Sequence, residues 1–196
     1  MTSTTPLAPT PPTHPVVRTA GTAWSVAPEP YDSPVAAALW RAYYTEVSDR
    51  WYLLHEGHVT DPDELEREVA ADTGDYLAPP NGVLLVARYE GAPVGTAGVR
   101  LMGPASDPHP PHGSGSATAE LKRVFLLAEA RGRGGAALLV TAAEDAARTL
   151  GAGRIVLDTR GDLVEARALY ARLGYEESAP HNDHAYAEHW FTKTLA

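Results

Sequence analysis

The stretch AELKRVFLLAEARGRGGAA, residues 119–137, decides how the rest of the chain is interpreted. Its first half is an extended run rich in Leu, Val and Phe, which is typical of a strand. Residues 131–136 then place three glycines beside two arginines, and an apolar pattern typical of a helix begins at Ala137. Glycines let backbone N–H groups approach an anion, and the unpaired N–H groups of a helix start stabilise negative charge. The stretch therefore predicts a binding site for a diphosphate-like anion.

The composition narrows the ligands that such a site would serve. The chain has 196 residues, which is a suitable length for one domain of moderate size. Its 25 acidic residues outnumber its 16 basic ones, giving a net charge of −9 and a pI of about 5.3. This balance argues against a protein that binds a nucleic-acid backbone. An acidic surface favours cationic small molecules instead.

The lack of cysteine and of long apolar segments excludes several classes of protein and site. The sequence has no cysteine, so it has no disulfide framework, no thiolate nucleophile and no Cys-based zinc site. No apolar run approaches the roughly 20 residues needed to span a bilayer. The first residues also lack the basic start and apolar middle of a signal peptide. We therefore expect a cytoplasmic protein with no membrane partner.

The N-terminal segment differs in composition from the rest of the chain. Residues 1–15 carry five prolines among threonine and alanine, with no Asp, Glu, Lys or Arg. Such a composition cannot bury a core, so residues 1–19 are predicted to be a disordered Pro/Thr-rich tail. Residues 20–196 are predicted to form a single domain.

Periodicity and end signals predict the order of elements in that domain. Ser33 with Pro34, and Asp61 with Pro62, mark two helix starts. The expected elements are a strand at 20–27, helices at 34–49 and 62–72, a hairpin of strands at 83–89 and 93–102, the strand and helix of the opening stretch up to residue 150, a strand at 154–158, a helix at 163–173, and closing strands at 175–177 and 185–195. This order indicates a layered, mixed α/β architecture.

Two stretches between these elements hold polar or aromatic groups of interest. Residues 50–58, which include Trp51 and Tyr52, lie between the first two helices and either close over a substrate or pack a helix onto the sheet. Residues 103–116 are rich in Pro and Gly around His109 and His112, so we expect a loop there. Two histidines without a carboxylate or Cys nearby favour a surface loop over a metal site.

One interpretation of the glycines is a dinucleotide site. Gly132-x-Gly134-x-x-Ala137 satisfies the loose dinucleotide pattern, and Asp158 at the end of the next strand would bind a ribose. In that fold, however, the first glycine directly follows the strand, whereas residues 129–131 intervene here. The motif also lies late in the chain, so this interpretation is the weaker one.

A second interpretation rests on several linked motifs. RGRGGA at residues 131–136 fits the pattern Arg/Gln-x-x-Gly-x-Gly/Ala at every fixed position. It is preceded by ELKRVFL at 120–126 and followed by LDT at 157–159, EARALYARLGY at 165–175 and YAEHWFTKTL at 186–195. In this order the motifs resemble those of the GNAT superfamily of acetyl-CoA-dependent N-acetyltransferases. The resemblance runs from about residue 83 to residue 195.

The resemblance implies a fold and an activity. The fold is α/β (mixed), with a central mixed, mostly antiparallel sheet that has a splayed central strand and is flanked by helices on both faces. The activity is transfer of an acetyl group from acetyl-CoA to the primary amine of a small molecule by direct attack, with no metal. Relatives often form homodimers. Two alternatives stay open: acetylation of a protein N-terminus or lysine, and a non-catalytic acyl-CoA-binding sensor.

The resemblance also implies the site. The pantetheine arm pairs with the splayed strand and the pyrophosphate binds the glycine loop, so the expected cofactor-binding residues are Val124, Phe125, Leu126, Arg131, Gly132, Arg133, Gly134, Gly135 and Ala136. Tyr170 is the expected general acid, although its spacing also fits the apolar stripe of its helix. Glu120 is the expected base. It is also placed to orient substrate or to pair with Lys122 or Arg123.

The chain departs from the family pattern near its C-terminus. Where bacterial relatives often carry Tyr-Asn-Asp-Asn-Pro-Tyr, residues 181–186 read HNDHAY. His181, His184 and His189 are therefore interpreted as surface histidines, with contact to substrate as the alternative. Arg160 stands where an Asn is common, which would change a contact near the cofactor or the substrate entrance.

Overall fold

The computed structural model describes residues 17–18, 23–103 and 117–195. Within these residues one mixed sheet has the strand order β1-β2-β3-β4-β5-β6-β8-β7. Its strands are β1 (Val17–Arg18), β2 (Trp24–Glu29), β3 (Gly82–Tyr89), β4 (Ala92–Leu101), β5 (Ala117–Leu126), β6 (Ala152–Thr159), β7 (Glu176–Glu177) and β8 (His189–Thr194). Every neighbouring pair is antiparallel except β5 and β6, which run parallel. The predicted fold class is confirmed.

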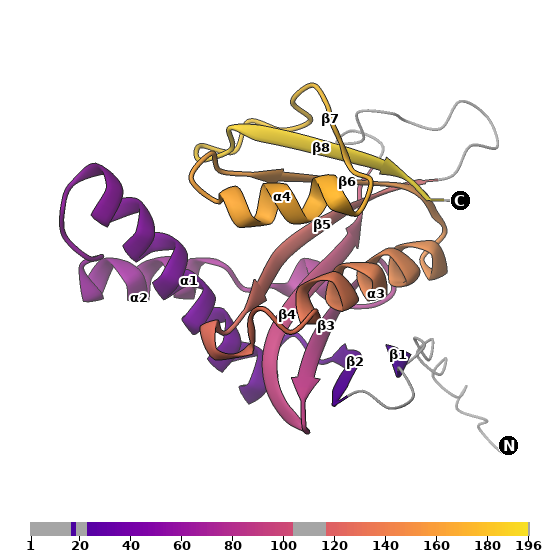
Figure 1. Ribbon diagram of the computed structural model, residues 1–196, viewed down its shortest axis with the longest axis horizontal. Helices are drawn as coiled ribbons and strands as arrows, with labels where there is room; N and C mark the ends of the chain where they lie inside the picture. Colours follow the sequence, from indigo (N-terminus) through magenta and orange to yellow (C-terminus); the bar gives the residue numbers. More distant parts are fainter. Residues whose placement is uncertain (1–16, 19–22, 104–116, 196) are drawn as a thin grey trace, which may run out of the picture.

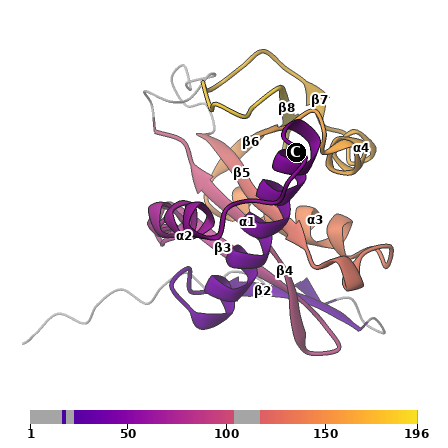
Figure 2. The same ribbon diagram turned by 90° about the vertical axis from the view of Figure 1, so that its left-hand side faces the viewer.

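Helices cover both faces of the sheet. α1 (Pro34–His55) and α2 (Pro62–Ala71) lie on one side, and α3 (Gly135–Thr149) and α4 (Val164–Arg172) lie on the other (Figures 1 and 2). Two 3-10 turns, η1 (Asp75–Leu77) and η2 (Ala128–Ala130), complete the described elements. The order of helices and strands follows the prediction.

The alternation of side chains along the strands gives each helix layer its own core. On β3, Val83 and Leu85 join the large cluster under α3 and α4, while Leu84 packs with Ala36 and Trp40 of α1. Successive strand residues point to opposite faces, so one continuous apolar run serves both layers. This explains why residues 82–87 of β3 are all buried.

Several predicted boundaries were wrong; the closing strand, for example, begins at His189 instead of residue 185. α1 begins at Pro34, with the Ser33 hydroxyl capping the Ala36 N–H as expected, but it continues to His55 instead of ending near residue 49. Most of the predicted 50–58 connection is therefore helix. The strand predicted to end at residue 27 continues through Pro28, which pairs with Leu85. Proline is tolerated there because β1 pairs only with Ser25 and Val26, leaving that edge of β2 open.

Some predictions concern residues that the structure does not describe. Residues 104–116, with His109 and His112, lie outside the described residues, as do 1–16 and 19–22 of the N-terminal part. Val17–Arg18, inside the predicted tail, pair with β2.

The packing of Gly135 against Trp24 connects the start of α3 to β2. A Cβ at Gly135 would lie 2.2 Å from Cη2 of Trp24, and the Trp24 indole N–H donates to the carbonyl oxygen of Arg133 at 3.1 Å. Trp24 also meets Tyr89 edge to face, with ring centroids 5.0 Å apart. The glycine loop is therefore held against a fixed ring.

We predict that Gly135→Ala lowers the free energy of unfolding by about 1–3 kcal/mol, since the added methyl group overpacks this contact. Urea unfolding measures the change. Gly103→Ala is the matched control, because a Cβ there meets no atom within 4 Å. A loss for Gly135→Ala no larger than that of Gly103→Ala would contradict the prediction. In a Trp24→Leu background the cost should shrink, as a double-mutant cycle would show.

Candidate functional site

The site begins where the two parallel strands separate. β5 and β6 pair from Ala117↔Ala152 to Glu120↔Val156. β5 then continues beside β4 to Leu126, while β6 continues beside β8 to Thr159 (Figure 1). The backbone of β5 beyond Glu120 therefore has a partner strand on one side only. A wedge-shaped opening in the middle of the sheet follows from this loss of pairing.

A bulge lies on β5 inside this opening. The register between β4 and β5 shifts by one residue between Thr96 and Gly98, and Arg123 has a φ of +52°. The Thr96 hydroxyl donates to the carbonyl oxygen of Arg123 at 3.0 Å, which holds the distorted backbone. A bulge leaves one residue outside the ladder and re-aims the side chains around it.

The Arg123 side chain reaches from the bulge to α1 and Asp72. Its guanidinium lies over the Trp40 ring, 3.9 Å from the ring centroid, and forms an ion pair with Asp72. Burial lowers the pKa of Arg123, although the nearby Tyr44 and Tyr43 oppose this effect. Arg123 thus fastens the strand to α1, and the sequence-based possibility that it pairs with Glu120 is wrong in this structure.

A cavity of about 710 Å³ fills the opening. β5, the glycine loop, the start of α3 and the inner face of α4 line it. Of the predicted cofactor-binding and catalytic residues, those that line it are Val124, Phe125, Leu126, Arg131, Gly132, Gly134, Gly135, Ala136 and Tyr170. Arg133 and Glu120 are not among its lining residues. The structure thus brings the strand, the loop and the tyrosine together around one space.

The glycine loop presents backbone N–H groups to this cavity. Gly132 and Gly134 have φ values of +74° and +83°, a left-handed conformation that residues with a Cβ rarely adopt. Gly134 is the N-cap of α3 and provides no side-chain cap, and the first turn has no acidic residue. The N–H groups at this helix start are therefore available to an anion.

The two loop arginines behave differently. The Arg131 guanidinium pairs with Glu46 of α1 at 2.6 Å and donates to the carbonyl oxygen of Leu126 at 2.8 and 2.9 Å. The Arg133 guanidinium lies over the Tyr89 ring, 5.0 Å from its centroid. Arg131 therefore lines the cavity with its charge partly compensated, whereas Arg133 braces the outside of the loop.

Tyr170 closes the inner end of the cavity. Its side chain is buried and packs against the rings of Tyr175 and Phe191, with centroids 5.6 and 6.0 Å away. Burial raises the pKa of Tyr170 well above its ordinary value, and the nearby Tyr43 and Asp158 act in the same direction. The phenol is therefore protonated at neutral pH, and its O–H is available as a hydrogen-bond or proton donor.

Glu120 lies at the point where the strands separate, and its carboxylate is 1 % exposed. Arg100 binds one oxygen at 2.6 Å and Lys122 binds the other at 3.2 Å. Burial raises the pKa of Glu120, but the charges of Lys122 and Arg100 and their hydrogen bonds outweigh it and lower the pKa below 4.5. The expected pairing with Lys122 is present, and Arg100 is a partner that the sequence did not suggest.

A second cavity of about 480 Å³ adjoins the first. The two share lining residues from α1, β5, β6 and the loop before α4, namely Tyr43, Tyr44, Val47, Lys122, Asp158, Thr159 and Leu163. Trp51 and Tyr52, on the extended end of α1, line the second cavity, as do residues 184–187. Arg160 ties its rim to α1, donating to the Val47 carbonyl at 2.8 Å and pairing with Asp162.

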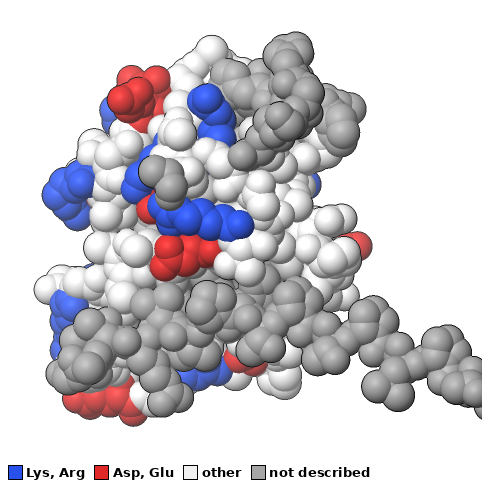
Figure 3. All heavy atoms as spheres, turned by 90° about the vertical axis from the view of Figure 1, so that its right-hand side faces the viewer, with Lys and Arg blue, Asp and Glu red and all other residues white. Residues whose placement is uncertain are grey.

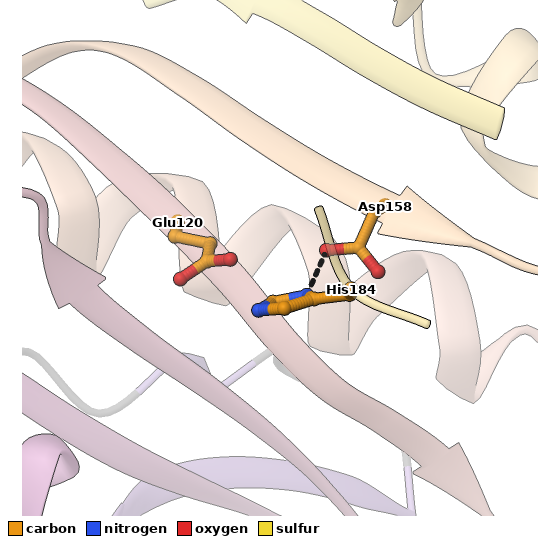
Figure 4. A group of neighbouring side chains, drawn as sticks. All are labelled: Glu120, Asp158 and His184. Atoms are coloured by element: carbon orange, nitrogen blue, oxygen red, sulfur yellow. Dashed lines mark hydrogen bonds and ion pairs between the residues drawn. The ribbon is translucent and has the colours of Figure 1, made fainter. Parts of the chain in front are cut away.

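A cluster of three titratable side chains lies beside this second cavity. Ligand atoms of Glu120, Asp158 and His184 are within 4.8 Å of one another. Figure 4 shows Asp158 hydrogen-bonded to one ring nitrogen of His184, while the other ring nitrogen points toward Glu120. This spacing would suit a metal ion, but Arg100 and Lys122 already neutralise Glu120 and repel a further cation. We therefore interpret the cluster as an acid–base group.

Charges of both signs are mixed on one face of the molecule. On the face at the right of Figure 1, basic side chains lie beside acidic ones instead of forming a broad basic patch (Figure 3). None of the helices in the described residues is long and apolar enough to cross a membrane.

Comparison with known proteins identifies the architecture. The family model described as the acetyltransferase (GNAT) family matches residues 37–175. The chain belongs to the GNAT family. It is therefore an acyltransferase, and the family uses acetyl-CoA. The match spans the splayed strand, the glycine loop and Tyr170, so the resemblance noted in the sequence is confirmed.

Individual relatives agree with this assignment. This GNAT chain is 33 % identical to the uncharacterized N-acetyltransferase YjgM of Escherichia coli K12 over 148 residues, covering 74 % of this chain and 77 % of that protein. Its fold resembles PaiA N-acetyltransferase from Thermoplasma acidophilum, solved with coenzyme A (TM-score 0.61, 12 % identity, 87 % and 98 % covered). It also resembles YncA of Salmonella typhimurium, solved with acetyl-CoA (TM-score 0.51, 16 % identity, 89 % and 95 % covered).

Sequence reasoning missed part of this GNAT site. The sequence suggests Asp158 only as a ribose ligand, and His184 as a surface histidine with contact to substrate as the alternative. The feature of the sequence that could have pointed to His184 is the departure of residues 181–186 from the common family pattern. That departure brings an imidazole to the end of β6, but only the fold shows which carboxylate it meets.

The ion pairs of Glu120 predict a pH-dependent stability. Arg100→Met leaves the buried carboxylate with Lys122 as its cation, and removing one partner of a buried pair costs up to about 3–5 kcal/mol. Arg100 is 34 % exposed and Lys122 remains, so we expect a loss of about 2 kcal/mol at pH 7. The lowered pKa of Glu120 stabilises the fold above pH 4.5, and this contribution disappears as pH falls through the folded-state pKa.

The cost of Arg100→Met should therefore be smaller at pH 3 than at pH 7, as measured by urea unfolding at both values. Arg154→Met is the control, because Arg154 lies in the same sheet and donates to the neutral Thr192 hydroxyl at 3.4 Å. Equal losses at the two pH values for Arg100→Met would contradict the pairing.

Proposed function

We propose that the protein is an N-acetyltransferase that moves the acetyl group of acetyl-CoA to the primary amine of a small molecule by direct attack. Acetyl-CoA occupies the larger cavity and the amine enters through the smaller one. The observation that carries this proposal is the meeting of the two cavities where β5 and β6 separate. Only there would a thioester and an amine approach each other.

The free edge of β5 suits the pantetheine arm. Beyond Glu120 the N–H and C=O groups of β5 that face β6 have no strand partner, and an extended amide-bearing chain is able to pair with them as an added strand. Val124, Phe125 and Leu126 are the residues of β5 placed for this role. The N–H groups of residues 131–136 and of the α3 start then receive the pyrophosphate.

In this proposal Arg131 supports the loop more than it binds phosphate directly. Its guanidinium already holds Glu46 and the carbonyl of Leu126, so it fixes the distance between β5 and the loop. Gly132, Gly134, Gly135 and Ala136 provide the close backbone approach. Arg133 acts through its packing on Tyr89.

Tyr170 is proposed as the general acid. It lines the larger cavity but not the second cavity, which supports a role on the side of the leaving sulfur. Its raised pKa keeps the phenol protonated until the thiolate forms, and a positioned acid of this kind lowers the barrier for thiolate departure.

Glu120 is the base that the family resemblance implies, and it remains a candidate. Its carboxylate is at the right depth, at the junction of the strands. Because Arg100 and Lys122 hold both of its oxygens and lower its pKa, an orienting role suits it better than proton abstraction.

The second cavity favours a compact acceptor. Its walls combine the rings of Tyr44, Trp51 and Tyr52 with the carboxylates of Glu68 and Asp158. Aromatic faces and carboxylates both attract an ammonium group. Its volume is within the range of small-molecule sites, about 300–1,000 Å³.

The proposed activity predicts a defined ligand response. Acetyl-CoA at a hundredfold excess over its Kd should stabilise the folded protein by about 2.7 kcal/mol, which a thermal-shift assay detects, whereas NAD should not. Thiol release from acetyl-CoA should appear with members of a panel of primary amines. Stabilisation by acetyl-CoA without turnover on any amine would instead support an acyl-CoA sensor.

We predict that Tyr170→Phe lowers kcat by about 100-fold or more while leaving the affinity for CoA nearly unchanged, because only proton donation is lost. Steady-state kinetics and CoA titration measure the two effects. Tyr175→Phe is the matched control, since Tyr175 is a buried neighbouring phenol that lines neither cavity. An unchanged kcat for Tyr170→Phe would remove Tyr170 as the acid.

A further inference from the structure

We propose that His184, held by Asp158, is the general base that removes a proton from the acceptor ammonium group. This inference rests on the proposed function and assigns one of its steps. It also gives Asp158 a positioning role that the family resemblance did not suggest.

The hydrogen bond between the two side chains fixes the state of the imidazole. Nδ1 of His184 lies 3.1 Å from Oδ1 of Asp158. An ionised carboxylate only accepts hydrogen bonds, so Nδ1 carries the hydrogen. Nε2 of the neutral ring therefore keeps its lone pair, and Figure 4 shows this nitrogen directed away from Asp158 toward Glu120. A ring in this tautomer is ready to accept a proton.

A chain of hydrogen bonds holds Asp158 in place. The Trp190 indole N–H donates to the amide oxygen of Asn182 at 3.0 Å, and the Asn182 amide N–H donates to Oδ1 of Asp158 at 2.8 Å. Asp158 and Trp190 are paired residues on β6 and β8. The segment that carries His184 is thus fixed to the sheet at Asn182, two residues away from the imidazole. The orientation of the base is therefore fixed by contacts with the sheet.

The location of His184 suits a base that acts on the amine. It lines the acceptor cavity and not the cofactor cavity, whereas Asp158 lines both. Tyr170 shows the reverse distribution, on the cofactor side alone. The base therefore lies on the side where the amine enters, and the acid lies on the side of the leaving sulfur. Acetyl transfer from sulfur to nitrogen requires this arrangement.

Charged and titratable groups face the imidazole from several elements. Glu120 and Lys122 come from β5, Asp158 from β6 and His181 from the same segment as His184. The remaining titratable groups that line the cavity are Tyr43, Tyr44, Tyr52, Glu68, Arg160 and Tyr186. Of the carboxylates, Glu120 is bound by two cations. It serves best to orient the imidazole or the ammonium group.

His181 is the rival base in the same segment. Its ring nitrogens are buried without a hydrogen-bond partner in the described structure, and burial lowers its pKa. It lines neither of these two cavities, whereas His184 lines the acceptor cavity. Mutation of each histidine in turn can therefore distinguish which of the two acts as the base.

The proton balance closes with these groups. Nε2 of His184 takes one proton from R–NH3⁺, and the free amine attacks the thioester carbon to form the C–N bond. The C–S bond then breaks, and the thiolate takes the Tyr170 phenol proton. The nitrogen of the new amide loses its extra proton, which restores the phenol. His184 releases its proton to solvent, so the products are the amide, CoA thiol and one proton.

The test is the pH dependence of kcat/KM in His184→Ala. The side chain is 45 % exposed, so its truncation should leave the fold and the acetyl-CoA thermal shift intact. We expect kcat to fall about 100- to 10,000-fold, and the acid-side inflection of the profile that the imidazole contributes to disappear. Added imidazole should restore part of the rate in proportion to its concentration.

Companion variants separate the roles. Asp158→Asn, which lets the ring adopt the other tautomer, should also lower kcat and move the inflection. His189→Gln is the matched control, because His189 lies on β8, contacts Glu177 of β7 and lines neither cavity. Glu120→Gln should keep the inflection if Glu120 only orients.

Two results would overturn the inference: a normal pH profile in His184→Ala, or loss of the inflection in His181→Gln or Glu120→Gln with His184→Ala unaffected. These outcomes differ from failure of the proposed function, which would appear as no turnover of any amine by the unaltered protein.

Discussion

The loss of pairing between β5 and β6 after Glu120↔Val156 is the constraint on which the rest of the structure depends. Two parallel strands that separate inside a sheet leave unsatisfied N–H and C=O groups in the protein interior, and such groups are costly unless water or a ligand reaches them. The opening therefore has to be a solvent-filled site. The bulge at Arg123, the glycine loop and the inner face of α4 all border it.

The supports of this opening lie on opposite faces of the sheet. On one face Arg123 stacks on Trp40 of α1 and pairs with Asp72, so the bulge cannot relax without breaking a buried contact. On the other face Trp24 packs on Gly135 and fixes the start of α3. Arg131 joins the two sides through Glu46. The cavity is thus preorganised by aromatic and ionic contacts whose partners are distant in sequence.

The sequence predicted the fold class, the order of elements and many of the residues that line the larger cavity, because capping residues, hydrophobic periodicity and the glycine loop are local signals. It missed what depends on distant pairing. The extension of α1 to His55 is stabilised by the rings of Trp51, Tyr52 and Tyr186, and the last of these is remote in the chain. Arg100 beside Glu120, and Asp158 beside His184, were equally invisible. Arg100 meets Glu120 through the register of β4 and β5, and His184 reaches Asp158 from the segment between β7 and β8.

The open edge of β5 also bears on how the protein behaves when it is empty. An unpaired strand edge is normally a hazard, because another chain is able to add to it. Here the edge borders the larger cavity, whose other walls include α4 and the end of β6, so a narrow, flexible molecule is able to pair with it. A molecule that pairs with this edge finishes the sheet. Ligand occupancy and the completeness of the fold are therefore linked, so the cellular supply of such a molecule would also regulate the lifetime of the folded chain.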